Sequence, residues 1–310
     1  MTYSSGGLIQ ALDYNTFVQG GASVDHAVAN INSVWGVGRG DKGYGQSTVL
    51  ATVVGGNDQV TATQWSTLIA RLNSALTHQA GSGSGLTAPT AGATITYLSA
   101  LSGKITDAFN NRLDASTNGT DVVDQGSSVY NFTSSTTATF SRTVTFASAD
   151  AARYFFNAGG KIIINFSAVN TGGNSKGTDW VSLIGSKMAS VTVGGYTNQR
   201  GGTGGTVSAS ATAYGYWNAG TTNRSIITLT SNSGTADYGS NSFAVGIRTN
   251  GVQGSNADVG TTLTFQMDLN DVAGDSAFND AVNVAITSKF TVRPPETTNL
   301  TSTWGTPSFS

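Results

Sequence analysis

The spacing of apolar residues changes about one third of the way along this chain, and that change constrains the fold more than any other feature. Up to about residue 118, apolar residues recur every three or four positions, as in residues 65–76. From about residue 127 they alternate with polar residues, most regularly in residues 263–269. The first spacing is typical of amphipathic helices and the second of half-buried strands. We therefore expect an α+β protein whose helical and β parts are segregated along the sequence.

The N-terminal part is expected to be a small helical module. Helices are predicted over residues 14–35, from Thr61 or Thr63 to about residue 76, and from about residue 94 to 113. Gly20-Gly21 interrupts the first, and Ser23 is placed to cap the piece that follows. Three helices with few bulky residues bury little apolar surface, so the module either folds alone or completes its core against another copy or another protein. The candidate docking residues are Trp35, Tyr44, Trp65, Leu68 and Leu72.

The C-terminal part contains about seven predicted strands. They lie within residues 139–146, 161–169, 207–214, 225–230, 243–247, 263–269 and 282–292. Gly-, Asn- and Ser-rich breaks separate them, which favours a mainly antiparallel β-sandwich of jelly-roll-like or Ig-like type. Short helical inserts are predicted at 148–160 and 179–188. The expected division is a docking module at 1–118, a linker at 119–126, a β-sandwich at 127–295 and a polar C-terminal tail at 296–310.

Composition excludes several classes of partner and site. Charged residues make up 10% of the 310 residues and the net charge is −2, whereas ordinary globular domains are about 25% charged. Lysines and arginines are scattered, so no nucleic-acid-binding face is predicted. With no cysteine, neither a disulfide nor a thiolate site can form. No secretory signal and no membrane-spanning apolar run is present. We expect a protein made in the cytoplasm that has no cofactor and no membrane insertion.

Groups for hydrolytic chemistry are sparse. Glycosidases typically use a pair of carboxylates, but this chain has a single glutamate, Glu296. Asp268, Asp271 and Asp275 are predicted to form a solvated strand end. A polysaccharide depolymerase therefore lacks its expected parts, and the sequence predicts that the protein is not an enzyme.

Nucleotide and metal sites are not predicted either. The glycine-dense stretch 35–46 lacks the Gly-Lys-Ser/Thr of a phosphate-binding loop and follows a predicted helix rather than a strand. His26 and His78 are expected on different helices, with no carboxylate or second histidine at metal-ligand spacing. A structural or surface role is expected for both.

One aromatic cluster has two open interpretations. Tyr214, Tyr216 and Trp217 lie close together on both sides of Gly215, within a stretch that suits a sandwich loop. Exposed aromatic rings on a sandwich loop stack on sugars or anchor a protein interface. The same rings also suit the core of the sandwich. They are the candidate contacts for a glycan or protein partner.

Several stretches form a familiar set. They are Asp13-Tyr14-Asn15, Val34-Trp35-Gly36-Val37-Gly38, Gly43-Tyr44-Gly45-Gln46, Gln64 to Leu68, Thr77 to Gly81, and the later segment Ala149 to Lys161. Together they cover about a third of the chain and resemble segments of structural proteins from tailed phages, especially phages of marine cyanobacteria and related hosts. The resemblance supplies no catalytic residues, because the matched positions are helix faces and glycine turns.

The resemblance implies a virion structural protein, such as a tail fibre, baseplate, neck or head-decoration subunit. We expect a tail-associated position, with 1–118 attaching to the particle and 127–295 displayed. The expected partners are further copies of the chain and other virion proteins. A host surface glycan, recognised by the displayed domain, is the alternative.

Overall fold

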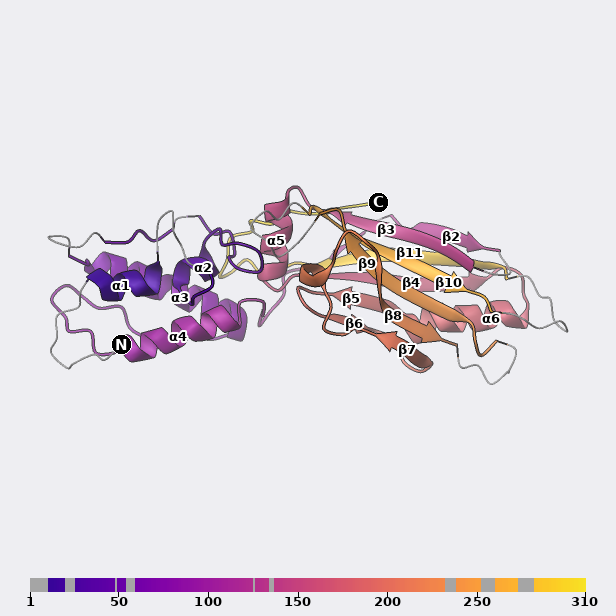
Figure 1. Ribbon diagram of the computed structural model, residues 1–310, viewed down its shortest axis with the longest axis horizontal. Coiled ribbons are helices and arrows are strands. Elements are labelled where there is room, and N and C mark those ends of the chain that lie inside the picture. The colour runs from indigo at the N-terminus through magenta and orange to yellow at the C-terminus, as the bar shows by residue number, and fades with distance from the viewer. Residues whose placement is uncertain are drawn as a thin grey trace. The chain divides into compact units, whose positions relative to one another are not determined.

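The computed structural model describes residues 11–19, 26–47, 49–53, 59–124, 126–133, 137–231, 238–251, 260–272 and 282–310. The predicted break at Gly20-Gly21, the predicted cap Ser23 and Asp275 lie outside these residues. The protein is α+β, with an N-terminal helical segment followed by two antiparallel sheets in a β-sandwich (Figure 1). This fold class confirms the prediction made from the two hydrophobic periods.

The chain divides into two compact units. The helical unit comprises Met1–Thr120, Arg153–Gly160 and Pro294–Trp304, and the sandwich unit comprises Asp121–Ala152, Lys161–Arg293 and Gly305–Ser310. The chain therefore passes from one unit to the other five times, after residues 120, 152, 160, 293 and 304. Two short segments from later in the sequence thus belong to the helical unit, whereas the sequence predicted a module confined to 1–118.

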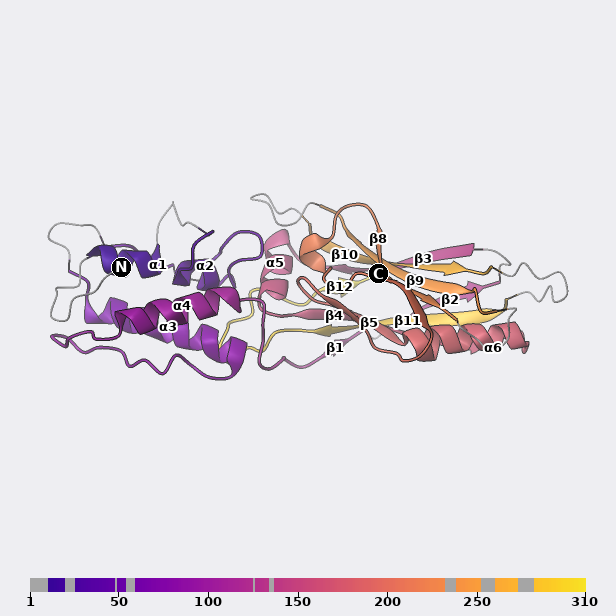
Figure 2. The same ribbon diagram turned by 60° about the horizontal axis from the view of Figure 1, so that its bottom comes forward.

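Four helices among the described residues lie entirely within the helical unit. They are α1 (Ala11–Val18), α2 (Ile31–Trp35), α3 (Ala62–Ala80) and α4 (Leu98–Asn110) (Figure 2). The longest, α3, begins where predicted, because Thr61 and Gln64 form a reciprocal capping box that satisfies two backbone N–H groups at the start of the helix. It ends at Gly81, whose φ of 77° is left-handed.

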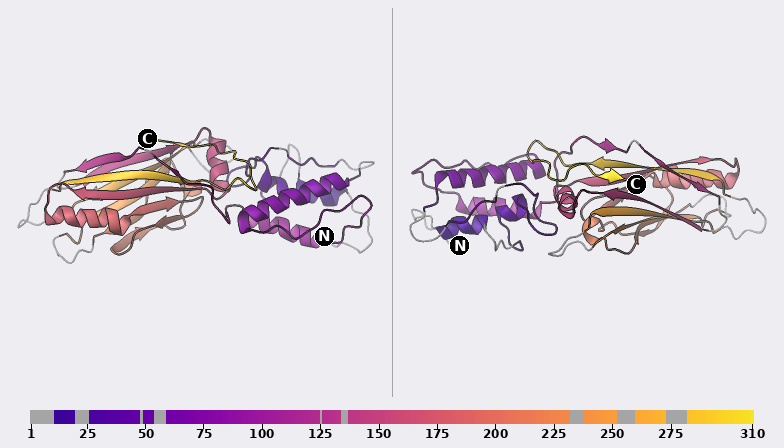
Figure 3. Two further views of the ribbon diagram at one scale, coloured as in Figure 1. Left: turned by 180° about the vertical axis from the view of Figure 1, so that it is seen from behind. Right: turned by 90° about the horizontal axis from the view of Figure 1, so that it is seen from above.

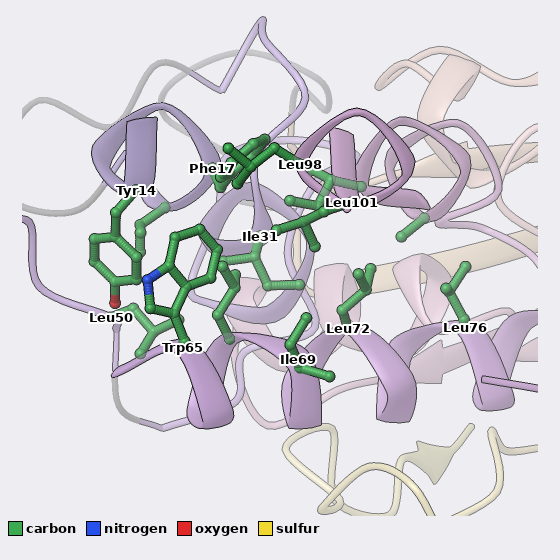
Figure 4. Packing of buried hydrophobic residues seen from close by; sticks show 14 of the residues in the cluster. Tyr14, Phe17, Ile31, Leu50, Trp65, Ile69, Leu72, Leu76, Leu98 and Leu101 are labelled. Carbon is green, nitrogen blue, oxygen red and sulfur yellow. The ribbon is translucent and has the colours of Figure 1, made fainter. Parts of the chain in front are cut away.

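The core of the helical unit is built on one face of α3. Trp65 lies 5.5 Å from Tyr14 and 6.1 Å from Phe17, measured between ring centroids. Leu68 and Leu72 continue the same face and are fully buried. Figure 4 shows this face meeting side chains from α1, α2 and α4. The three-to-four spacing of the sequence therefore marks the interior of this unit.

The sandwich unit contains two sheets in which every strand pair is antiparallel. The first sheet consists of β1 (Val122–Val123), β2 (Ser128–Phe132), β11 (Val284–Arg293), β4 (Lys161–Asn170), β5 (Ser190–Val193) and β6 (Asn198–Arg200). Its order is β1-β11-β4-β5-β6, and β2 also pairs with β11.

The second sheet has the order β12-β3-β10-β9-β8-β7. Its strands are β3 (Thr137–Thr145), β7 (Thr206–Ser210), β8 (Arg224–Thr230), β9 (Ser242–Thr249), β10 (Thr262–Asn270) and β12 (Ser308–Phe309). The two sheets form two layers, seen from behind and from above in Figure 3.

Aromatic pairs join the two sheets. Phe166 on β4 meets Phe243 on β9 edge to face, with 5.3 Å between the ring centroids. Phe265 on β10 lies 5.6 Å from Phe290 on β11. In each pair the two rings come from different sheets, so the apolar positions of the alternating strands do face a common core.

Both predicted helical inserts are present. The first is α5 (Ala149–Asn157), which crosses from the sandwich unit into the helical unit after Ala152. The second is α6 (Ser175–Val181), continued by a π-helical turn over Ser182–Met188. This pair connects β4 to β5; α6 packs on β4 and β11, and the π-helical turn packs on β4, β8 and β9. Within the described part of the chain, no helix has the length and apolar composition needed to cross a membrane.

The π-helical turn ends in a strained residue. Ala189 has φ 56° and ψ −55°, a conformation that the Cβ of an L-residue disfavours. Its N–H donates to the carbonyl of Ile184 at 3.0 Å, and its own carbonyl accepts from Phe166 at 2.7 Å. These two bonds hold the strained geometry between helix and strand.

Replacing Ala189 with glycine is expected to stabilise the sandwich unit by about 1 kcal/mol, because the strain relieved exceeds the extra backbone entropy of glycine in the unfolded chain. Chemical denaturation of the full chain measures the change. A matched Ala→Gly change at Ala168 on β4 relieves no such strain and is expected to destabilise instead. A loss of stability in Ala189→Gly would contradict the claim that the backbone of Ala189 is strained.

The C-terminal residues differ from the predicted polar tail. Leu300 and Trp304 are buried, and the backbone of Thr301 exchanges two hydrogen bonds with the side chain of Gln46 at 2.8 and 2.9 Å. Ser308–Phe309 forms β12 and pairs with β3. Residues 294–310 are therefore an integral part of both units.

Candidate functional site

The residues predicted to dock on a partner lie largely in the interior. Tyr44, Trp65, Leu68 and Leu72 are buried, and Trp35 is half-buried. The Tyr44 hydroxyl accepts a hydrogen bond from Gln79 at 2.6 Å. The prediction that these five residues form a docking surface is therefore wrong for at least four of them, because the core of the helical unit already uses them.

The glycine-dense loop at 35–46 binds a later segment of the chain. Carbonyl oxygens of this loop accept hydrogen bonds from the Arg153 guanidinium, at Val37 and Gly40. The Asn157 side chain donates to Gly40 at 3.1 Å and to Gly43 at 2.9 Å. The loop thus presents acceptors to cationic and amide donors. An anion nest is built from converging N–H groups instead.

A glycine is required where this segment approaches most closely. Gly45 has φ 67°, and a Cβ placed on it would come within 2.4 Å of the Tyr154 ring. Both the backbone conformation and the contact exclude a side chain at this position. The glycines of the loop therefore serve packing within the helical unit.

His78 and the single glutamate meet although 218 residues separate them. His78 Nδ1 lies 2.9 Å from Glu296 Oε1, and His78 Nε2 lies 3.0 Å from the carbonyl oxygen of Ala158. Both ring nitrogens face acceptors, so the ring links the two late segments of the helical unit to α3. No sequence signal marked this pair, since a polar tail and a solitary histidine each have ordinary alternative roles.

The carboxyl group of Glu296 is held ionised. Burial acts to raise its pKa, but hydrogen bonds from His78, from the Asn299 side chain and from the backbone N–H groups of Asn299 and Thr298 lower the pKa below the ordinary value. This carboxylate contacts one nitrogen of the His78 ring, and the other nitrogen contacts the carbonyl oxygen of Ala158. The arrangement therefore suits a structural role, in which His78 on α3 links residues 158 and 296. Among the described residues, no three His, Asp or Glu side chains gather as metal ligands.

The aromatic cluster of the sandwich unit is mostly internal. It lies between β7 and β8, where Tyr216–Asn218 form a 3-10 turn. Tyr216 is fully buried and donates from its hydroxyl to the carbonyl of Gly260 at 3.1 Å. Trp217 is buried too, and the two rings contact edge to face at 5.2 Å. These two residues anchor the turn, as the core interpretation of the cluster requires.

The third aromatic residue, Tyr214, is also buried, with 7% of it exposed, but it lines a surface recess. The recess has a volume of about 430 Å³ and is lined by Ala211, Ala213, Tyr214, Asn218 and Arg224. The Arg224 guanidinium stands over the Tyr214 ring, 4.2 Å from its centroid. Arg224 is exposed, and it forms no ion pair within the described residues. The recess therefore presents the Arg224 guanidinium, stacked on the Tyr214 ring, next to the side-chain amide of Asn218.

The backbone around the recess is fixed. Asn198 on β6 donates from its side chain to the carbonyls of Ala211 and Tyr214 at 2.6 and 2.7 Å. Gly215 packs so closely that a Cβ there would lie 2.4 Å from the carbonyl oxygen of Gly194. A site on a rigid edge binds without first ordering its own residues. Sequence reasoning found Tyr214 from its aromatic neighbours and missed Arg224, which stands alone in a polar stretch.

Comparison with protein-family models, with curated proteins and with solved structures gave no match.

Proposed function

We propose that this protein is a structural, non-enzymatic component of a tailed-phage virion. Its position is tail-associated, in a fibre, baseplate or neck appendage, with head decoration as the alternative. The helical unit attaches to the particle and the sandwich unit is displayed. Its partners are other copies of the chain and other virion proteins.

The observation that supports this proposal is where the phage-like segments lie. The segments between residues 13 and 81 belong to the helical unit, and so does Arg153–Gly160 from the later phage-like segment. They bind one another through Arg153, Asn157 and His78. Segments that are distant in sequence and recur together in one kind of protein are expected to share a common module.

Four of the five predicted docking residues are buried, so attachment to a particle requires other residues. Attachment cannot use Trp65, Leu68 or Leu72 unless the helical unit opens, since these side chains are in its core. The helical unit is therefore proposed to dock as a folded body, through surface residues outside that set.

The test is to locate the protein on purified particles. Phage particles encoding this chain are separated from lysate by density gradient and analysed by mass spectrometry, and antibodies against the sandwich unit are used for immunogold labelling. We expect the chain to co-purify with intact particles, with gold on the tail or its appendages. Absence from particles that contain the known capsid protein would refute the proposal, and gold on the head would select the alternative position.

The recess at Arg224 favours a second function, recognition of a host-surface glycan. Stacked aromatic and guanidinium groups bind sugar faces and carboxylate or sulfate substituents. The candidate contacts change accordingly, because Tyr216 and Trp217 do not line the recess. Tyr214, Asn218 and Arg224 are the groups that line the recess.

Binding of the full chain to an array of neutral and acidic glycans tests this function. We expect a preference for acidic glycans and at least a tenfold loss in Arg224→Gln, corresponding to about 1.4 kcal/mol. Arg39→Gln removes an exposed arginine from the helical unit and serves as the matched control, with binding unchanged. Equal binding by wild type and Arg224→Gln would exclude the recess as the glycan site.

A further inference from the structure

The sandwich unit buries a lysine and an aspartate against each other. Lys176 lies in the first turn of α6, and Asp271 follows the end of β10. Lys176 Nζ and Asp271 Oδ2 are 2.6 Å apart, and only 1% of Lys176 and 5% of Asp271 is exposed. The sequence placed Asp271 at a solvated strand end, and this placement is wrong. Burial of the Lys176 side chain carries Asp271 into the interior with it.

Burial of two opposite charges in a protein interior has a large desolvation cost. Removing both ions from water costs several kcal/mol per ion, and their attraction repays this only with excellent geometry and further hydrogen bonds. The neutral forms of such a pair are an amine and a carboxylic acid, and transfer of neutral polar groups from water to an apolar interior costs less than transfer of ions. These neutral forms are also the reactive ones, since an unprotonated amine is a nucleophile and a protonated carboxyl group can lose its hydroxyl.

Proximity supplies the remaining requirement for reaction. Holding two reacting groups in contact makes a bimolecular step effectively unimolecular, and closure of the site from water prevents the reverse hydrolysis from competing. Lys176 Nζ and Asp271 Oδ2 are already within ion-pair distance, and the two residues come from a helix and from the position that follows an interior strand of the second sheet.

A second buried carboxyl group, that of Asp179, is connected by hydrogen bonds to Val272, the residue that follows Asp271. Val272 N–H donates to Asn241 Oδ1 at 3.1 Å, and Ser231 N–H donates to the carbonyl of Asn241 at 2.9 Å. The hydroxyl of Ser231 contacts both carboxyl oxygens of Asp179 at 2.6 Å. Asp179 stands three residues after Lys176 on α6, a spacing that places both on one side of the helix.

Asp179 is suited to carry a proton. Burial raises its pKa, and the hydrogen bond from Ser231 and the charge of Lys187 offset only part of that rise. A carboxyl group with a raised pKa accepts and returns protons more readily near neutral pH than an ordinary aspartate does.

We propose that Lys176 and Asp271 condense to an isopeptide bond inside the sandwich unit. The lone pair of Lys176 Nζ attacks Asp271 Cγ, a new N–C bond forms, and the C–O bond to the carboxyl hydroxyl breaks. That hydroxyl leaves as water together with one proton from the amine, and Asp179 relays this proton. The reaction needs no oxidant, reductant or cofactor. In a chain without cysteine, this bond covalently ties α6 to the end of β10, as a disulfide would in other displayed domains.

The mass of the intact, fully denatured 310-residue chain tests the proposal directly. We expect a mass lower than that of the sequence by one water molecule. After tryptic digestion, cleavage beyond Lys176 is expected to be lost, and one branched peptide should contain both Lys176 and Asp271. An unmodified mass with normal cleavage after Lys176 would overturn the proposal, and so would water loss confined to a peptide without Lys176, such as a succinimide.

Three variants assign the bond to its residues. Lys176→Arg keeps a positive charge but has no nucleophilic amine, and Asp271→Ala removes the electrophile; both are expected to have the unmodified mass. Lys161→Arg changes an exposed lysine at the start of β4 and is the matched control, which should retain the water loss. Water loss persisting in either of the first two variants would contradict the assignment.

The role of Asp179 is measured through the rate of bond formation. Chains are labelled in a short pulse of cell-free synthesis, and the fraction of labelled chains lacking one water is followed with time after the pulse in wild type, Asp179→Asn and Asp179→Glu; circular dichroism of the purified proteins checks that each is folded. We expect the asparagine variant to be slowed at least tenfold and the glutamate variant to recover much of the rate. An unchanged rate in Asp179→Asn would remove Asp179 from the reaction.

Discussion

Replacement of Leu72 by alanine is expected to destabilise the helical unit by about 2–5 kcal/mol, the range for large-to-small changes in a packed core. Leu72 is 0% exposed and belongs to the cluster that contains Trp65 and Ile69. The change removes buried methyl groups and leaves a cavity that the neighbouring helices fill only in part. Chemical denaturation of the full chain, followed by far-ultraviolet circular dichroism, measures the loss, because the long helix α3 lies in this unit.

Leu12→Ala is the matched control for this change. It deletes the same atoms from α1, in the same unit, but Leu12 is 70% exposed. Its effect is expected to stay within about 0.5 kcal/mol, as for surface substitutions in general. If Leu72→Ala kept full stability and instead abolished self-association, Leu72 would be an interface residue, as the sequence predicted, and the interior position would be wrong.

The local features of this fold were predictable, because they depend on neighbours in sequence. The capping box at Thr61 and Gln64 lies within four residues, and the alternation of β10 identifies its buried face without knowledge of any partner strand. Where the period is clear, hydrophobic spacing alone locates an element. The strands β1, β5, β6 and β12 are two to four residues long. Strands this short contain too few alternating apolar and polar residues to be recognised from the sequence.

The long-range features were not predictable from one sequence. Residues 296–310 are polar in composition, so the buried Leu300 and Trp304 gave no sign of packing. The contact between Lys176 and Asp271 joins a helix to a strand end across 95 residues, counted as 271 minus 176. A single lysine or aspartate in a polar stretch is ordinarily exposed to solvent, and only the tertiary structure shows that these two are buried.

The aromatic cluster illustrates the same limit at the candidate site. Tyr214, Tyr216 and Trp217 are almost adjacent, and composition alone cannot say which ring faces outward. All three are buried, but Gly215 lets the turn approach the 194–195 backbone, and of the three only Tyr214 lines the recess. Arg224 then reaches Tyr214 from the start of β8. The pairing that defines the recess therefore depends on the β7–β8 register.

Glu296→Ala is expected to lower the free energy of unfolding by about 3 kcal/mol, as for removal of one partner from a buried pair. The substitution leaves His78 Nδ1 and the N–H groups of Thr298 and Asn299 without their acceptor. Glu296→Gln keeps one acceptor oxygen and is expected to cost about half as much. Asp107→Asn, at an exposed pair with Lys104, is the matched control and should change stability by less than about 1 kcal/mol.

The same carboxylate predicts how the stability of the helical unit depends on pH. The pKa of Glu296 is lower in the folded protein than its ordinary value of 4.5, so the unfolded chain binds its proton at a higher pH. The contribution of Glu296 is therefore complete above about pH 4.5 and is lost as the pH falls through the folded pKa. Denaturation midpoints between pH 7 and pH 3 should fall more steeply for wild type than for Glu296→Gln, so that the two curves converge at low pH. Parallel curves would show that the carboxylate is not held ionised by His78 and the 296–299 turn.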